Sequence, residues 1–198
     1  YVLERYKRGC ETIAYGGDHA VRAELLVEVA DKKNIHIDHS YALSICRVEP
    51  ENNVHIILEA FSRSELPIVF IGNWESSEYG RSLFRDYKDN KNINLLMPVY
   101  CLDVLHTYRA SCSVYIHGHS AGGTNPSLVE IMHFSKPIVA YDCSFNKATM
   151  ENKGNYFTCA DDLVKLLESK NVLEEGTVLS EIAQRRYTWD IVRKQYLE

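Results

Sequence analysis

The sequence predicts an α/β domain built on a Rossmann-like parallel β-sheet with helices on both faces. Short apolar runs of strand length alternate along the chain with amphipathic segments of helix length, which is the βαβα pattern of such a sheet. Most of these runs are continuously apolar, as expected of strands that are buried on both faces. The chain has 198 residues, 45% of them hydrophobic, so it is long enough to bury a full core in one domain.

The expected elements alternate from residue 41 onward. Strands are expected at residues 41–46, 67–72, 93–96, 113–117, 137–141 and 155–158. Apolar residues at helical spacing predict helices over 53–62, 77–87, 102–110 and 126–134, then a helical tail over 161–169 and 181–196 with a break around 187–189. Because each helix follows a strand, the crossovers are expected to be right-handed.

Composition excludes several classes of function. The chain carries 22 Lys and Arg against 27 Asp and Glu, a net charge of −5, and no basic stripe of the kind that neutralises a nucleic-acid backbone. No run approaches the roughly 18 consecutive apolar residues that a membrane-spanning helix needs. The six cysteines form no CxxC pair and are predicted to be reduced, mostly buried thiols of a cytoplasmic protein.

Ligands of such folds bind beyond the carboxyl ends of the strands, and one loop there is distinctive. Residues 117–127 leave a buried strand, pass through two adjacent glycines and enter a helix at Asn125 and Pro126. Asn suits the N-cap and Pro suits the first helical turn. Glycines let a ligand approach the backbone closely, so the loop amides are predicted to face a diphosphate; the alternative is an ordinary tight turn. The amides in question are those of Gly122, Gly123, Thr124 and Ser127.

Two charged side chains are placed to complete this site. Glu130 lies one turn into the helix, where its paired oxygens are suited to the two vicinal hydroxyls of a ribose; the alternative is an exposed helix glutamate. Arg47 ends the first strand and is predicted to grip the phosphates in a bidentate manner. The alternative for Arg47 is a surface ion pair with Glu49 or Glu51.

His117 and His119 lie on one face if the strand continues through them. With Asp142 they suggest a metal site, but the favoured interpretation is that one ring hydrogen-bonds a phosphate or sugar while the other packs, and that no metal is bound. The chain has no GxxxxGK[ST] motif and no GxSxG motif. These absences argue against P-loop nucleotide hydrolysis and make a serine hydrolase a less favoured interpretation.

Two stretches resemble a known family. Arg-Val-Glu-Pro-Glu-Asn-Asn-Val from Arg47, followed by Ile-Leu-Glu-Ala-Phe at 57–61, resembles the Arg-x-x-Pro-Glu-Lys-Gly/Asn…Leu-x-x-Ala-Phe stretch of GT-B enzymes in the "glycosyl transferases group 1" family. That family carries two glutamates eight residues apart, of which the second binds the donor's ribose. Here Glu130 has the second position and Gly122 the first, and Asn52 replaces the family's lysine.

The site loop is closest to one branch of that family. Residues 117–128 resemble the His-Gly-His-x-x-Gly-Gly-Thr-Asn-Pro-Ser-Leu signature of the rhamnosyltransferase-like branch, and the resemblance covers residues 40–155. It implies that residues 19–180 form the C-terminal, nucleotide-sugar-binding half of a GT-B enzyme. Residues 1–18 would be a remnant of the N-terminal domain and the interdomain linker. Residues 181–198 would form helices that cross back toward the missing N-terminal domain.

The resemblance also assigns roles to residues. Arg47 and His119 are the expected catalytic residues, with His119 in contact with a phosphate or the donor sugar. The loop after the third strand would offer backbone groups to the nucleobase, and the glycine after the second strand would permit close approach of the ligand. The corresponding binding positions are Gly72, Asn73, Val99 and Tyr100. The alternatives are an ordinary turn at Gly72 and Asn73 and a capping role for Tyr100.

The implied activity is transfer of a hexose, such as rhamnose from dTDP-rhamnose, to a glycan or lipid-linked acceptor in bacterial polysaccharide biosynthesis. Such enzymes need no metal or other cofactor, because amides and basic side chains neutralise the leaving diphosphate. The resemblance implies a cytoplasmic protein, with peripheral contact to the inner face of the cell membrane, and inactivity of this half alone. The alternatives are a sugar-nucleotide epimerase of the same fold and a non-catalytic GT-B-like binding domain.

Overall fold

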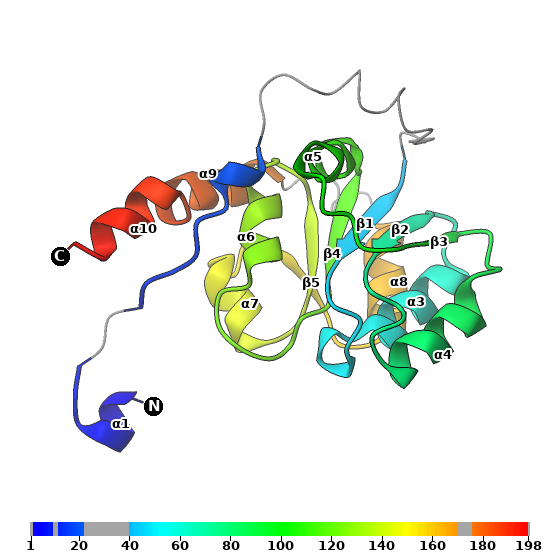
Figure 1. The fold of residues 1–198 in the computed structure, drawn as a ribbon, viewed down its shortest axis with the longest axis horizontal. Helices are drawn as coiled ribbons and strands as arrows, with labels where there is room; N and C mark the ends of the chain where they lie inside the picture. Colours follow the sequence, from blue (N-terminus) through cyan, green and yellow to red (C-terminus); the bar gives the residue numbers. More distant parts are fainter. Residues whose placement is uncertain (1, 10–11, 22–39, 170–175, 198) are drawn as a thin grey trace.

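The computed structural model describes residues 2–9, 12–21, 40–169 and 176–197. Its centre is a six-stranded sheet in the order β3-β2-β1-β4-β5-β6, in which every neighbouring pair is parallel (Figure 1). The strands are β1 (Ala42–Ile45), β2 (Ile68–Ile71), β3 (Ile93–Leu96), β4 (Val114–His117), β5 (Ile138–Tyr141) and β6 (Asn155–Phe157). The predicted fold class is confirmed. Because β1 lies beside β4, the strand order reverses between them, and that position is where a ligand crevice forms in such sheets.

Helices connect the strands and continue beyond the sheet as a tail. They are α3 (Val54–Arg63), α4 (Glu78–Tyr87), α5 (Leu102–Ser111), α6 (Pro126–Met132), α7 (Ser144–Thr149), α8 (Ala160–Glu168), α9 (Gly176–Arg186) and α10 (Trp189–Gln195). The shorter elements are α1 (Val2–Tyr6) and the 3-10 turns η1 (Asp18–Ala20) and η2 (Pro50–Asn52). Within the described ranges, no helix combines the length and the apolar character needed to cross a bilayer.

The core consists of two apolar layers, one on each face of the sheet. Helices α3, α4 and α8 contribute to the first layer, and α5, α6 and α9 contribute to the second (Figure 1). Strand β1 supplies both layers, since Ala42 packs into the first and Leu43 into the second. Both residues are fully buried, as the continuous apolar runs predicted.

Helix α7 was not predicted from the sequence. Its residues lack an apolar repeat, and tertiary hydrogen bonds of Asn146 explain why it forms there. Asn146 Nδ2 donates to the carbonyl of Tyr141 at 2.9 Å and to that of His119 at 2.8 Å. The expected break in the tail is present between α9 and α10, where the Thr188 hydroxyl accepts a bond from the Ile191 amide.

The cysteines differ in part from the prediction. All five in the described ranges are free thiols, but only Cys112 is buried, while Cys46 and Cys143 are half-buried, so the expectation that most are buried is wrong. The two exposed thiols are Cys101 and Cys159. Each precedes the first residue of a helix, α5 and α8, where the chain leaves the core. Burial raises the thiol pKa of Cys46 and of Cys112 to about 12. Cys10 lies outside the described residues.

The loop after β1 and the loop after β4 are joined by hydrogen bonds to buried backbone. Asn53 Nδ2 donates to the carbonyl of Gly118 at 2.8 Å. Ser120 donates twice to the carbonyl of Glu51, from its amide at 2.9 Å and from its hydroxyl at 2.8 Å. Because buried polar groups are costly when unbonded, these contacts fix the spacing between the two loops.

Gly118 is required for this approach. A Cβ added at Gly118 would lie 2.0 Å from the carbonyl oxygen of Asn52 and 2.9 Å from Cδ1 of Ile57. The first of these atoms is backbone and has little freedom to move away. Any side chain at position 118 would therefore push the two loops apart.

We predict that Gly118→Ala lowers the free energy of unfolding by about 3 kcal/mol, at the upper end of overpacking costs. Gly123→Ala is the matched control in the same loop, because a Cβ there meets nothing within 4 Å; its effect should stay within about 0.5 kcal/mol. Urea unfolding followed by circular dichroism measures both. Equal stabilities of the two variants would contradict the proposed loop contact.

Candidate functional site

A cleft of about 380 Å³ opens at the carboxyl ends of β1 and β4. Its lining residues come from the end of β1, from the loops after β1 and β4, from α5 and from α6. They are Ile45, Cys46, Arg47, Asn52, Arg109, His119, Asn125, Pro126, Ser127 and Glu130. The cleft therefore brings together both predicted catalytic residues and three of the predicted binding residues, and it sits at the switch point between β1 and β4.

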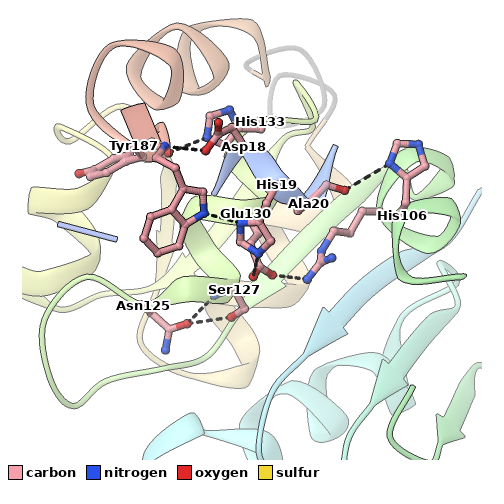
Figure 2. A network of polar contacts seen from close by, with 11 residues as sticks. Asp18, His19, Ala20, His106, Asn125, Ser127, Glu130, His133 and Tyr187 are labelled. Carbon is pink, nitrogen blue, oxygen red and sulfur yellow. Dashed lines mark hydrogen bonds and ion pairs between the residues drawn. The ribbon is translucent and has the colours of Figure 1, made fainter. Parts of the chain in front are cut away.

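Glu130 contacts a basic side chain through each of its two carboxylate oxygens (Figure 2). Its Oε2 accepts a hydrogen bond from Nη2 of Arg109 on α5, and its Oε1 lies 3.4 Å from Nε2 of His19. The Glu130 side chain is 15% exposed and that of Arg109 only 6%. The alternative of an exposed helix glutamate is therefore wrong, and the carboxylate lies in the wall of the cleft.

Arg109 and His19 were both missed in the sequence. Arg109 stands in the last turn of α5, where a cation usually interacts with the helix C-terminus in solvent, so its local pattern gave no signal. His19 belongs to a short segment with no periodicity. Each owes its position to a partner far away in sequence, which no local pattern reveals.

His119 is oriented by the loop after β1. Its Nδ1 lies 2.7 Å from Oδ1 of Asn52, while Nδ2 of Asn52 donates to the carbonyl of Arg47 at 2.8 Å. Because an amide oxygen only accepts, the Nδ1 of His119 carries the proton. Burial lowers the pKa of His119, and the nearby Arg47 lowers it further while the Ala121 backbone opposes them. At neutral pH the ring is therefore neutral, and its Nε2 is a hydrogen-bond acceptor.

His117 packs, as predicted for one histidine of the pair. It is 2% exposed, its ring is stacked 6.3 Å from that of Tyr115, and its Nε2 has no hydrogen-bond partner in the described structure. Burial, with a smaller contribution from His119, lowers the pKa of His117 to about 3. In the ranges that the structure describes, no group of three or more His, Cys, Asp or Glu side chains could hold a metal ion.

The glycine loop keeps its amides unused. Among the described residues, no hydrogen bond takes up the amides of Gly122, Gly123 or Thr124. Gly122 has φ +104°, a backbone conformation that side chains rarely adopt. The loop is therefore shaped for close approach to the backbone.

Asn125 forms the predicted N-cap of α6, and this changes the expectation for Ser127. Oδ1 of Asn125 accepts from the amide of Ser127 at 3.0 Å and from its hydroxyl at 2.8 Å. The Ser127 amide is thus bonded within the protein and does not face a ligand. Ser127 still lines the cleft with its side chain.

Arg47 is exposed and forms no ion pair with any described residue. The alternative of a surface pair with Glu49 or Glu51 is therefore not observed. Arg47 lines the cleft, and no carboxylate of the described residues competes there for its charge. Arg109, the other arginine of the cleft lining, differs from Arg47 because it forms an ion pair with Glu130.

Seven predicted binding residues lie outside the cleft lining. Three belong to the glycine loop, namely Gly122, Gly123 and Thr124, and four follow β2 and β3, namely Gly72, Asn73, Val99 and Tyr100. The amide of Gly72 donates to the carbonyl of Leu96 at 3.1 Å, and an added Cβ would lie 2.7 Å from Cγ2 of Val48. The space beside this glycine is therefore occupied by the side chain of Val48. Oδ1 of Asn73 accepts from an amide two residues on. Val99 packs against the core and Tyr100 is 86% exposed.

The low pKa of His117 predicts a pH-dependent stability. Between pH 6.5 and about 3 the unfolded chain binds a proton at this residue while the folded chain does not, so the free energy of unfolding falls on acidification. Its contribution is about 2 kcal/mol between pH 6.5 and 4.5. His117→Gln should show a correspondingly smaller loss over that interval in urea unfolding, and an identical loss would contradict the assignment.

Comparisons with known proteins agree with this architecture. The family model described as "Glycosyl transferases group 1" matches residues 28–171. No protein with a curated description matches the chain. A glycosyltransferase from Rickettsia africae superposes with a TM-score of 0.80 at 13% identity, covering 99% of this chain and 58% of that one.

Two further solved structures are similar in fold. Anabaena HepE in complex with UDP has a TM-score of 0.72 at 14% identity, covering 93% of this chain and 54% of that one. Sucrose-phosphate synthase from Thermosynechococcus elongatus has a TM-score of 0.70 at 15% identity, covering 98% and 53%. The chain thus spans little more than half the length of these proteins. From the match over most of its length, the chain belongs to the group 1 glycosyl transferase family.

Proposed function

We propose that this domain binds a nucleotide-diphosphate sugar and acts as the donor half of a glycosyltransferase. The observation that carries the proposal is the cleft at the carboxyl ends of β1 and β4, which is lined by Glu130 and by Arg47, an arginine without an ion pair to any described residue. The glycine loop, whose amides are unused in the described structure, lies beside it, since an added Cβ at Gly122 would be 3.6 Å from Nε2 of the lining residue His119. Each of these groups matches one part of such a donor. The structures of HepE in complex with UDP and with UDP-glucose support a donor of this class.

Glu130 is the proposed partner of the ribose. Each carboxylate oxygen has two lone pairs, and in the free domain Arg109 and His19 each engage one oxygen. One lone pair on each oxygen therefore remains for the two vicinal hydroxyls. Compensation of the carboxylate charge by Arg109 keeps the group in place when water is displaced from the cleft.

Arg47 and the loop amides are the proposed partners of the diphosphate. The guanidinium offers paired N–H donors, and the amides of Gly122, Gly123 and Thr124 are not used elsewhere within the described structure. These donors would stabilise the charge that develops as the bond between sugar and phosphate breaks, without a metal ion. Each is expected to lower the barrier by about 3 kcal/mol.

The donor sugar is proposed to be a deoxyhexose such as rhamnose, presented as dTDP-rhamnose. Gly122 stands where the resembling family has its first glutamate, and His119 offers a neutral Nε2 that accepts from a sugar hydroxyl. The position next to the sugar is therefore less acidic than in the family pattern. A deoxyhexose has one hydroxyl fewer than a hexose, so it does not need the glutamate that Gly122 replaces as a hydroxyl acceptor.

The acceptor is proposed to be a glycan or a lipid-linked saccharide of bacterial polysaccharide synthesis, on the cytoplasmic side. Since the chain spans about half of its structural relatives, we expect no transfer by this chain alone. Four basic side chains of the tail pair with only two carboxylates, which leaves a net positive charge there for the proposed peripheral contact with the membrane. These pairs are Arg185 and Arg186 with Glu151, and Arg193 and Lys194 with Asp190.

The proposal is tested by calorimetric titration of the chain with UDP, dTDP, GDP and inorganic pyrophosphate. At least one nucleotide should bind, and Glu130→Gln should weaken that nucleotide about tenfold while leaving pyrophosphate unchanged. Glu168→Gln is the control variant, because it removes one negative charge at the exposed end of α8, outside the cleft lining. Thermal unfolding checks that each variant is folded.

Two results would overturn the proposal. If none of the three nucleotides binds at millimolar concentration to the folded chain, the domain is not a donor half. If Glu130→Gln weakens nucleotide and pyrophosphate equally, Glu130 does not contact the ribose. A non-catalytic role remains only if nucleotides bind and the protein with its acceptor half transfers no sugar.

Arg47→Gln should weaken both the nucleotide and pyrophosphate, by about tenfold each, because the guanidinium acts on the phosphates. Stability should change little, since the residue is exposed and forms no ion pair in the described chain. Arg85→Gln removes an exposed cation of α4 and serves as the control. Titration at two salt concentrations distinguishes the local contact from general charge effects, and unchanged pyrophosphate binding in Arg47→Gln would contradict the assignment.

A further inference from the structure

Three segments that are distant in sequence meet around Glu130 (Figure 2). The η1 segment approaches it from the amino-terminal part of the chain, α6 carries it, and the start of α10 lies against η1. The amide of Gly17 donates to the carbonyl of Tyr187 at 2.7 Å, and the amide of Trp189 donates to Oδ1 of Asp18 at 2.8 Å. The η1 segment and the preceding Gly17 are therefore fixed to the C-terminal tail by one backbone–backbone hydrogen bond and one bond from a backbone amide to the Asp18 carboxylate.

The junction is tightly packed. An added Cβ at Gly16 would lie 2.7 Å from Cδ2 of Trp189, and one at Gly17 would lie 2.6 Å from the carbonyl oxygen of Val129, the residue before Glu130. The ring of Trp189 also meets that of Tyr15 edge-on at 5.0 Å. With no room for side chains between them, the three segments have little freedom to shift relative to one another.

The ring of His19 lies between Trp189 of α10 and Glu130 of α6, with one ring nitrogen toward each. The indole N–H of Trp189 donates to Nδ1 of His19 at 2.9 Å. An indole nitrogen only donates, so Nδ1 must be unprotonated and Nε2 must carry the proton. That Nε2 faces Oε1 of Glu130 at 3.4 Å, and a carboxylate only accepts. Both interactions of the ring thus require the same tautomer, and each reinforces the other.

We propose that Trp189 and His19 are positioning residues for Glu130, through a relay in which the Trp189 indole selects the His19 tautomer that presents an N–H to the carboxylate. The inference rests on the proposed ribose role of Glu130 and extends it to the tail. Arg109 donates a hydrogen bond to Oε2 of Glu130, and His19 contacts Oε1 of the same carboxylate. The orientation of both oxygens is then set before a donor arrives, which lowers the ordering cost of binding the ribose.

The relay predicts an effect that depends on the ribose hydroxyls. Trp189→Phe keeps the ring that packs on Tyr15 and Gly16 and keeps the backbone bond to Asp18, but it removes the indole N–H. The Kd of the chain for UDP should rise about fivefold. The Kd for 2′,3′-dideoxy-UDP, which has no vicinal hydroxyls, should not change. If dTDP or GDP is the nucleotide that binds, the same comparison is made with it and its analogue lacking the ribose hydroxyls.

Three further variants separate positioning from general loosening of the tail. His19→Phe removes both interactions and should behave like Trp189→Phe, whereas His19→Gln retains an N–H donor at the position of Nε2 and should bind UDP more nearly as the unaltered chain does. Tyr187→Phe removes the hydroxyl bond to the carbonyl of Thr149, 2.9 Å long, in the same corner. It should leave both affinities unchanged.

A measurement on the free chain tests the relay without any nucleotide. The nitrogen-15 shifts of the His19 ring should identify the Nε2–H tautomer in the unaltered chain and a mixture of tautomers in Trp189→Phe. The carbon-13 shift of the Glu130 carboxylate should move in the same variant. An Nδ1–H tautomer in the unaltered chain, or an unmoved carboxylate shift, would overturn the relay.

The titrations distinguish the failure of the relay from that of the proposed function. Equal weakening of UDP and its dideoxy analogue in Trp189→Phe, or no weakening at all, overturns the relay while nucleotide binding stands. Failure of the unaltered chain to bind any nucleotide overturns the ribose role and with it the functional part of this inference. Selective weakening of UDP in Trp189→Phe and His19→Phe, with none in Tyr187→Phe, supports it.

Discussion

The ion pair between Glu130 and Arg109 is the interaction on which the candidate site depends. Moving a carboxylate out of water costs several kcal/mol unless an opposite charge and hydrogen bonds compensate it. Arg109 supplies that charge from a side chain that is 6% exposed and whose Nε has no hydrogen-bond partner in the described chain. Removing the charge of either partner would leave the other charge uncompensated in a largely buried position. The pair therefore places a charged acceptor in the cleft wall at the cost of a buried cation in α5, a compromise typical of binding sites.

Topology explains why distant residues converge there. In the order β3-β2-β1-β4-β5-β6, β1 and β4 are neighbours although two strands separate them in the sequence. The loops that follow β1 and β4 leave the sheet side by side, and the hydrogen bonds between them restrict the movement of one loop relative to the other. Arg47 comes from the first loop, His119 from the second, and Glu130 from the helix that the second loop enters. Asn52, which replaces a lysine of the family pattern, bonds both to the backbone of Arg47 and to the ring of His119. It acts as a connector between the loops.

Periodicity and helix-capping rules were enough to predict all six strands, the main helices and the Asn125 N-cap, because those features are determined by neighbouring residues. The sequence did not reveal Arg109 or His19, whose roles depend on partners across the fold; the Trp189 that bonds His19 lies 170 residues away. The Ser127 amide differed from expectation for a local reason, since the Asn125 side chain that caps the helix takes that donor. Helix α7 was missed because tertiary hydrogen bonds, and no apolar repeat, hold it.

The two departures from the family pattern are related through charge and backbone shape. Replacing a lysine by Asn52 removes a positive charge, and replacing a glutamate by Gly122 removes a negative one, so the charge balance is preserved. The cleft keeps two arginines against one glutamate, and a diphosphate still meets a positive surface. The backbone of Gly122 has a φ of +104°, which a residue with a side chain would adopt only with strain. An added Cβ would also lie 3.6 Å from Nε2 of His119, so a glutamate at this position would bring its side chain close to the histidine ring. The unused amides of this loop therefore depend on the glycine, and under the proposed function they would offer the phosphates hydrogen-bond donors in place of the family's lysine.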